Sequence, residues 1–343
     1  AGDGKEGGVG GQSAVLSPVT DDFFRENLCT DFGALHDIVH AKLAEMKMAN
    51  PQLAGNVSFS TIAEMQKFVE KYPEMNKLKD NVSKHVNILH ALSGLVDRHC
   101  LMEVSEIEQQ LACVQDHRTA HKQVMQMLSD DKVRDVDKLR LALLYALRYQ
   151  KESEEKGTLP QIERALPSRP LEGSFLSSSG GDEHALPRPH EFPEVLLSVC
   201  GTQQRTPQSD LFNRGVNAVL SKGLKGFSSS ESNAYMLHEP LLARILKLVD
   251  KAKLPEDKYP FRPCSSYKSA VDAFRTLKRG PSELIVFIVG GATYAECRVV
   301  DMFNERNKQM RVVLGATSLL STASFLESVA ARADAKKNGG AAA

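Results

Sequence analysis

Residues 284–314, LIVFIVGGATYAECRVVDMFNERNKQMRVVL, decide the fold class of this chain. The stretch opens with six apolar residues, Leu284 to Val289. An unbroken apolar run this short predicts a strand that is buried on both faces, as in a parallel sheet. Gly290 and Gly291 end the strand, a helix is predicted to about residue 307, and residues 311–314 predict a second strand. The stretch therefore predicts one βαβ unit.

Two parallel strands do not make a stable sheet by themselves. No other stretch of the chain has a convincing parallel-strand pattern, and the chain begins with Ala1 rather than Met. We therefore expect a fragment of a longer protein, whose remaining strands lie elsewhere. The predicted fold class is α/β and predominantly helical: a large helical domain joined to the closing βαβ part of a parallel sheet.

Composition excludes several classes of function. The 343 residues carry 43 basic and 43 acidic side chains, so the formal net charge is zero. That balance removes the simplest argument for nucleic acid or an anionic membrane as a partner. The six cysteines contain no CxxC pair, which indicates a reducing compartment and no structural zinc site. No apolar run approaches the roughly 20 residues of a membrane span, and no secretory signal is present.

A helical domain is predicted over residues 20–150, and it includes a helical hairpin over residues 31–72. Apolar residues recur at helical spacing in both halves of the hairpin, and Asn50-Pro51 separates the halves. Thr61 and Glu64 form the capping pair that begins the second half. The apolar positions are Phe32, Leu35, Val39, Leu43 and Met46, then Ile62, Met65, Val69 and Tyr72.

Four further helices follow in the same domain. The first covers residues 74–99, and its predicted buried side also holds His85, which we interpret as a core histidine bonded to backbone. Ser105 with Glu108 predicts the start of a short helix, and another helix covers residues 117–128. Residues 136–149 are apolar on nearly all sides, which predicts a central helix. The buried side of the first helix is predicted to be Met75, Leu78, Val82, Leu89, Leu92 and Val96.

The rest of the chain is divided by its composition. Residues 1–19 and 332–343 are rich in glycine and small residues and are predicted to be disordered. Residues 151–191 are rich in proline, serine and glycine, which predicts a flexible insertion. Residues 192–280 predict helices that lead back to the sheet, at 192–200, 212–222 and 237–252. Residues 281–331 form the C-terminal part of the α/β domain.

The turn Gly290–Thr293 lies where α/β proteins bind phosphate, between a strand and a helix. It lacks both the GxGxxG pattern and the lysine of a P-loop. Glu296 would also place a negative charge where the phosphate should lie. We interpret Thr293 and Glu296 as a capping box. An α/β enzyme that binds a nucleotide or a sugar phosphate here remains the alternative.

Two histidine patterns resemble metal-binding spacings. Cys113, His117 and His121 lie four residues apart, but Asp116 predicts a helix start between them, and no fourth ligand is evident. We interpret these residues, like the pair His36 and His40, as part of a solvated helix face. The sequence therefore predicts no metal, no cofactor and no catalytic residue.

The hairpin carries the candidate binding residues. Met48 and Phe59 lie near its tip and outside its apolar stripes. Exposed methionine and aromatic groups suit an adaptable protein contact. Lys42, Glu45 and Lys67 are charged positions outside the same stripes. These five residues form the predicted contact surface.

Several stretches resemble the SM (Sec/Munc) family of syntaxin-binding proteins. They include FVEKYPEMNKLKDNVSKHVNIL at 68–89, LRLALLYALRYQ at 139–150 and IVFIVGGATYAECRVV at 285–300. The resemblance covers most of residues 21–330 and breaks at 151–191. It implies an arch-shaped protein of three domains, of which this chain holds the helical third domain and the closing strands of the second. The family's site for the syntaxin N-terminal peptide lies in the first domain, so we expect this chain to lack it.

The resemblance also implies a function. It implies a non-enzymatic binder of a syntaxin-type SNARE and of the assembling SNARE bundle, with the hairpin as the contact. Such a protein promotes SNARE assembly in vesicle docking and fusion, here in Golgi-to-endosome or vacuole transport. It would be cytoplasmic and would reach Golgi and endosomal membranes only through its SNARE partners. A helical scaffold without a SNARE role is the other alternative.

Overall fold

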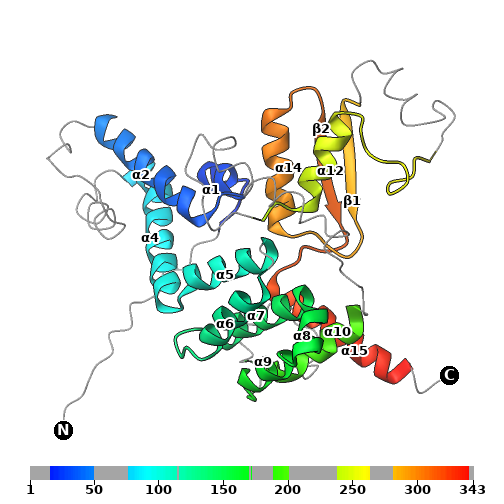
Figure 1. The fold of residues 1–343 in the computed structure, drawn as a ribbon. Coiled ribbons are helices and arrows are strands. Elements are labelled where there is room, and N and C mark those ends of the chain that lie inside the picture. The colour runs from blue at the N-terminus through cyan, green and yellow to red at the C-terminus, as the bar shows by residue number, and fades with distance from the viewer. Residues whose placement is uncertain are drawn as a thin grey trace, which may run out of the picture. The chain divides into compact units, whose positions relative to one another are not determined.

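The computed structural model describes residues 16–49, 76–113, 116–169, 171, 188–200, 238–262 and 281–339 (Figure 1). Its contacts divide the chain into one unit of residues 1–95 and a second of residues 96–343. The elements are α1 (Asp22–Asn27), α2 (Phe32–Ala49), α4 (Asn76–Arg98), α5 (Leu101–Cys113), α6 (His117–Leu128), α7 (Asp135–Arg148), α8 (Gln150–Lys156), α9 (Leu159–Ala165), the 3-10 helix η4 (Pro189–Glu191), α10 (Phe192–Cys200), α12 (Leu241–Asp250), β1 (Glu283–Ile288), α14 (Tyr294–Arg306), β2 (Arg311–Ala316) and α15 (Thr322–Gly339).

The first unit contains α1, α2 and most of α4. On α2, Val39 and Leu43 are each only 1% exposed, which confirms these two positions of the predicted stripe. The buried side of α4 differs from the prediction, because Leu92 is 40% exposed while Val86 is fully buried. The buried side of α4 is thus the one that holds Val86 and Leu89, next to His85, whose ring packs against Phe23 of α1.

The helical core of the second unit is built around α7, as predicted. α5, α6, α9 and α10 all pack against α7, and α15 packs against α10. Tyr145 of α7 is fully buried. α5 begins at Leu101, so Ser105 lies inside the helix and the predicted cap there is wrong. The fully buried core positions in these helices include Val104, Val124, Leu139, Leu141, Ala142, Ile162, Phe192 and Leu196.

Three assignments differ from the sequence prediction. Residues 151–165, predicted as flexible, belong to the helices α8 and α9, because Ile162 is apolar and fully buried in the helical core. The sequence predicts residues 322–331 to belong to the α/β part, but Leu326 and Val329 of α15 lie in that same helical core. α15 also continues to Gly339 instead of ending near residue 331. The predicted helix 212–222 lies outside the described residues.

The predicted βαβ unit is confirmed. β1 and β2 pair in parallel, in a register from Glu283 opposite Arg311 to Ile288 opposite Ala316. α14 connects them. One face of the pair packs against α14 and α12, where side chains from all four elements form a second core. That core contains Leu242, Leu246, Val300 and Val312, with Leu284, Val286, Val299, Phe303 and Leu314 packed against it.

The other face of the two strands is exposed in the described residues. Ile285, Phe287 and Val313 are 77%, 61% and 48% exposed, so the prediction of a strand buried on both faces is wrong here. The two covering helices that the structure describes lie on one side, and alternate residues of a strand point to opposite faces. An exposed apolar face beside unpaired strand edges is a site for self-association.

We therefore expect this chain to self-associate through Ile285 and Phe287. The double variant Ile285→Thr/Phe287→Thr keeps the β propensity of the strand while removing its apolar surface. Sedimentation velocity should show concentration-dependent association of the parent chain and a largely monomeric variant. Val19 is an apolar residue outside the two strands and is 83% exposed. Val19→Thr is therefore the control and should behave like the parent. A monomeric parent chain would contradict the prediction.

Candidate functional site

α2 provides the described part of the predicted contact surface. The Asp31 side chain accepts a hydrogen bond from the Ala34 N–H at 3.0 Å, which caps the start of the helix. Val39 and Leu43 then lie four residues apart, on one face, and both are buried. The inner face of α2 is thereby fixed, and the other side is left to face outward.

The outward side of α2 carries three of the predicted residues. Lys42 and Glu45 form an ion pair at 3.0 Å, with side chains that are 48% and 69% exposed. Met48 is 83% exposed. At 3.6 residues per turn, Met48 lies about half a turn around the helix from Val39. Phe59 and Lys67 lie outside the described residues, so the hairpin itself stays a prediction.

An ionic contact that the sequence analysis missed ties the start of α1 to α4. Asp21 caps α1 by accepting a hydrogen bond from the Phe24 N–H at 3.0 Å. The same carboxylate meets Lys84 Nζ at 2.5 Å and His85 Nε2 at 2.9 Å. His85 is thus bonded to a carboxylate, and the predicted backbone partner is wrong. The sequence signals only the cap, because aspartates stand before the apolar pair Phe23-Phe24, as at an ordinary helix start. The contact with α4 has no local signal.

Water screens the interactions of the Asp21 carboxylate only weakly, because Asp21 is 2% exposed. Burial raises the pKa of its carboxyl group, but the hydrogen bonds from Lys84, the Phe24 N–H and His85, together with the charge of His85, outweigh burial and lower the pKa to about 2. The carboxylate therefore stays ionised at neutral pH and holds the two α4 side chains against α1.

The turn Gly290–Thr293 forms the predicted capping box. Glu296 accepts hydrogen bonds from both the N–H, at 2.7 Å, and the hydroxyl of Thr293. The Gly290 N–H donates to the Thr317 hydroxyl at 3.0 Å, and the Ala292 N–H donates to the Ser318 carbonyl at 2.9 Å. The N–H groups that would hold a phosphate at these three positions already have acceptors.

Gly291 is required in this turn for two reasons. Its φ of 110° is in the region that favours glycine. A Cβ atom on it would also lie 2.7 Å from both Leu320 Cγ and the Ser318 hydroxyl. The glycine therefore serves a close approach of two chain segments, rather than an open cradle for a ligand.

The Cys113, His117 and His121 spacing does not form a metal site. α5 ends at Cys113 and α6 begins at His117, capped by Asp116, as predicted. His117 is only 8% exposed, so a solvated face is the wrong interpretation for it, and its Nε2 lies 2.7 Å from the Tyr145 hydroxyl. Burial lowers the pKa of His117. The described residues contain no group of three side chains placed to hold a metal ion.

The described fold is a helical body together with a parallel βαβ unit, and it defines the class of protein. The family model described as the Sec1 family matches residues 10–328. The chain belongs to the Sec1 family. This result confirms the resemblance to SM proteins found in the sequence.

Particular relatives make the comparison more specific. Vacuolar protein sorting-associated protein 45 of Rattus norvegicus is 33% identical over 321 residues, which are 93% of this chain and 51% of the relative. The homologue of Arabidopsis thaliana is 33% identical over 317 residues, 91% of this chain and 49% of the relative. The chain thus spans about half the length of the relatives it matches.

A solved structure of the SM protein Vps45 in complex with the Qa SNARE Tlg2 is similar with a TM-score of 0.63 and 31% identity. The similarity covers 94% of this chain and 51% of that one. Within the described part of the chain, no helix combines the length and apolar character needed to cross a membrane.

Proposed function

We propose that this chain is part of an SM-type protein that binds syntaxin-type SNARE helices and promotes SNARE assembly in vesicle docking and fusion. The observation that carries the proposal is the likeness, at 31% identity, to the Vps45 that was solved with a Qa SNARE. We place the protein on the Golgi-to-endosome or vacuole route. It acts in the cytoplasm and associates with Golgi and endosomal membranes through its SNARE partners.

The proposed contact is the outward side of α2 with the hairpin that it begins. Met48 supplies an apolar anchor, and the Lys42–Glu45 pair supplies flanking charges. An amphipathic partner helix binds such a surface through side chains at helical spacing. Holding a disordered SNARE segment in this way lowers the conformational entropy that is still to be lost when the SNAREs assemble.

We also propose that the protein is a binder and has no catalytic activity. The turn that the enzyme alternative requires has Glu296 at the start of α14, and its N–H groups at Gly290, Ala292 and Thr293 are occupied. A phosphate there would have to displace these bonds and approach a carboxylate. The geometry therefore favours the protein-binding function over the nucleotide or sugar-phosphate alternative.

Substitution at the hairpin tip tests the proposal. The double variant Met48→Ala/Phe59→Ala should weaken binding of a syntaxin-type SNARE helix by about 1–3 kcal/mol, because anchoring side chains dominate interface energies. Calorimetry with the SNARE helix measures the affinity, and melting curves measure the fold. The melting temperature should stay nearly unchanged, since Met48 is 83% exposed.

Two further variants separate the anchor from its surroundings. Val19→Ala removes another apolar side chain that is 83% exposed in the same unit, and it should leave SNARE binding intact. Exchanging the charges in Lys42→Glu/Glu45→Lys keeps their ion pair and should act mainly on the association rate and its salt dependence. If the tip variant melts early and the remaining folded protein binds normally, the SNARE site lies elsewhere.

A further inference from the structure

A basic cavity opens beside the start of α7 in the second unit. Its volume is about 800 Å³, within the range of small-molecule sites. It is lined by Arg98, Lys132, Arg134, Lys138 and Arg169, with His99 and only two acidic residues, Asp131 and Asp135. The described lining therefore carries an excess of three positive charges in a chain whose formal net charge is zero.

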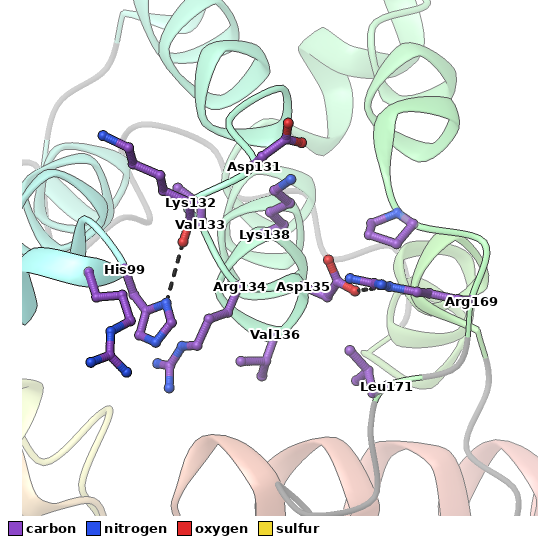
Figure 2. Close-up of a pocket in the computed structure, with 12 residues that line it drawn as sticks. His99, Asp131, Lys132, Val133, Arg134, Asp135, Val136, Lys138, Arg169 and Leu171 are labelled. Carbon is purple, nitrogen blue, oxygen red and sulfur yellow. Dashed lines mark hydrogen bonds and ion pairs between the residues drawn. The ribbon is translucent and has the colours of Figure 1, made fainter. Parts of the chain in front are cut away.

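Two of the five cations are already paired. Arg169 Nε lies 2.6 Å from Asp135 Oδ2 across the cavity wall (Figure 2). Arg134 Nε lies 2.7 Å from the carboxylate of Asp137, which is fully buried and also binds Arg140. These pairs use Asp135 and Asp137 and fix the positions of the two guanidinium groups.

Three cations in the lining remain without a carboxylate partner among the described residues: Arg98, Lys132 and Lys138. Lys138 is the informative one, because it is 8% exposed and yet lines the cavity. The ammonium group itself is open to solvent, since it is not one of the buried polar atoms without a partner, and it can therefore meet a ligand in the cavity. Asp131 is the one carboxylate left in the lining, and it is exposed. An anion inside the cavity would supply the missing charge.

We propose that this cavity binds a small anion that carries two or more phosphate groups. Phosphate oxygens are acceptors only, and lysine and arginine are the side chains that bind them best. A peptide would also bring N–H donors. Two acceptors in the wall are already engaged, since Asp135 binds Arg169 and the Lys132 carbonyl lies 3.4 Å from His99 Nδ1, which leaves the exposed Asp131 as the one carboxylate for such donors. The ligand is either a soluble polyphosphate or the multiply phosphorylated headgroup of a lipid.

Calorimetry of the whole chain with inositol hexakisphosphate is the first test. We expect saturable binding that weakens with added salt. Lys138→Gln should lower the affinity about tenfold or more, since a hydrogen bond from a charged group to the phosphate is lost. Lys122→Ala, at an exposed lysine of α6 outside the cavity, is the matched control and should bind like the parent chain.

Asp131→Asn is a gain-of-binding test that a damaged fold cannot imitate. Removing the one unpaired carboxylate should tighten binding by about two- to fivefold, the size of an exposed charge interaction. Arg98→Ala, at an exposed position, should weaken binding without the folding risk of Lys138. Lack of saturable heat, or equal losses in Lys122→Ala and Lys138→Gln, overturns the proposal.

Vesicle sedimentation distinguishes the two sources of phosphate. Vesicles with phosphatidylinositol bisphosphate are compared with phosphatidylserine vesicles of equal charge. If only the phosphatidylinositol bisphosphate vesicles retain the chain, and Lys138→Gln abolishes that retention, the ligand is the lipid headgroup. Binding of inositol hexakisphosphate without vesicle retention assigns a soluble ligand. Equal retention by both vesicles that persists in Lys138→Gln, together with no calorimetric binding, overturns the site.

Discussion

Replacing Leu43 with alanine is expected to destabilise the first unit by roughly 2–5 kcal/mol, the usual range for a buried leucine. Leu43 is 1% exposed and lies on the inner face of α2, one turn after Val39. Shortening it removes apolar contacts and leaves a cavity that the surrounding helices fill only in part. Chemical unfolding followed by circular dichroism, with attention to the earliest transition, measures the loss.

Met48→Ala on the same helix is the matched control. Met48 is 83% exposed, so its truncation should change the free energy of unfolding by no more than about 0.5 kcal/mol. The contrast also serves the functional proposal, because it separates a core position from a contact position on a single element. Equal effects of the two substitutions would mean that α2 is not oriented as described.

Local signals allowed much of the fold to be predicted from the sequence. The bounds of α6 agree with the prediction, because Asp116 marks its start and an apolar stripe defines its length. Thr293 and Glu296 were predicted as a capping box for a similar reason, since both partners lie within one turn. The central helix α7 and the start of the second strand agree with the apolar runs that predict them, although β2 continues past the predicted end at residue 314 to Ala316.

Long-range contacts could not be predicted in this way. The partner of His85 is Asp21, 64 residues earlier, and no spacing rule connects them. The burial of Val86 instead of Leu92 depends on which side of α4 meets α1, and tertiary packing decides this. α8 and α9 give no signal in the overall composition of 151–191, because its proline, serine and glycine content conceals the buried residues Ile162 and Leu166.

The candidate site was predicted in part. Met48 and the pair Lys42 and Glu45 are exposed on α2, as their positions outside the apolar stripe predicted. The basic cavity beside α7 was not foreseen, because Arg98, Lys138 and Arg169 are brought together by three separate segments of the chain. Charges that are scattered along a sequence with zero net charge give no local signal.

Replacing Asp21 with asparagine should cost about 2 kcal/mol of stability at pH 7 and change how stability depends on pH. The folded-state pKa of Asp21 is about 2, against about 3.9 in an unfolded chain. A pKa lowered on folding gives stability that is complete above the unfolded pKa and is lost as the pH falls through the folded pKa. The contribution should therefore disappear between about pH 4 and pH 2.

Asparagine is the informative replacement because it still accepts a hydrogen bond at the start of α1 and is as good a helix cap as aspartate. What it loses is the charge that meets Lys84 and His85. Unfolding measured from pH 7 to pH 2 should show the parent chain falling toward the variant as the carboxyl group takes up its proton. The neighbouring residue Asp22 forms an exposed ion pair with Arg25. Its replacement in Asp22→Asn should change stability by less than about 1 kcal/mol. Parallel pH curves for the parent and Asp21→Asn would mean that Asp21 holds no ionic contact with α4.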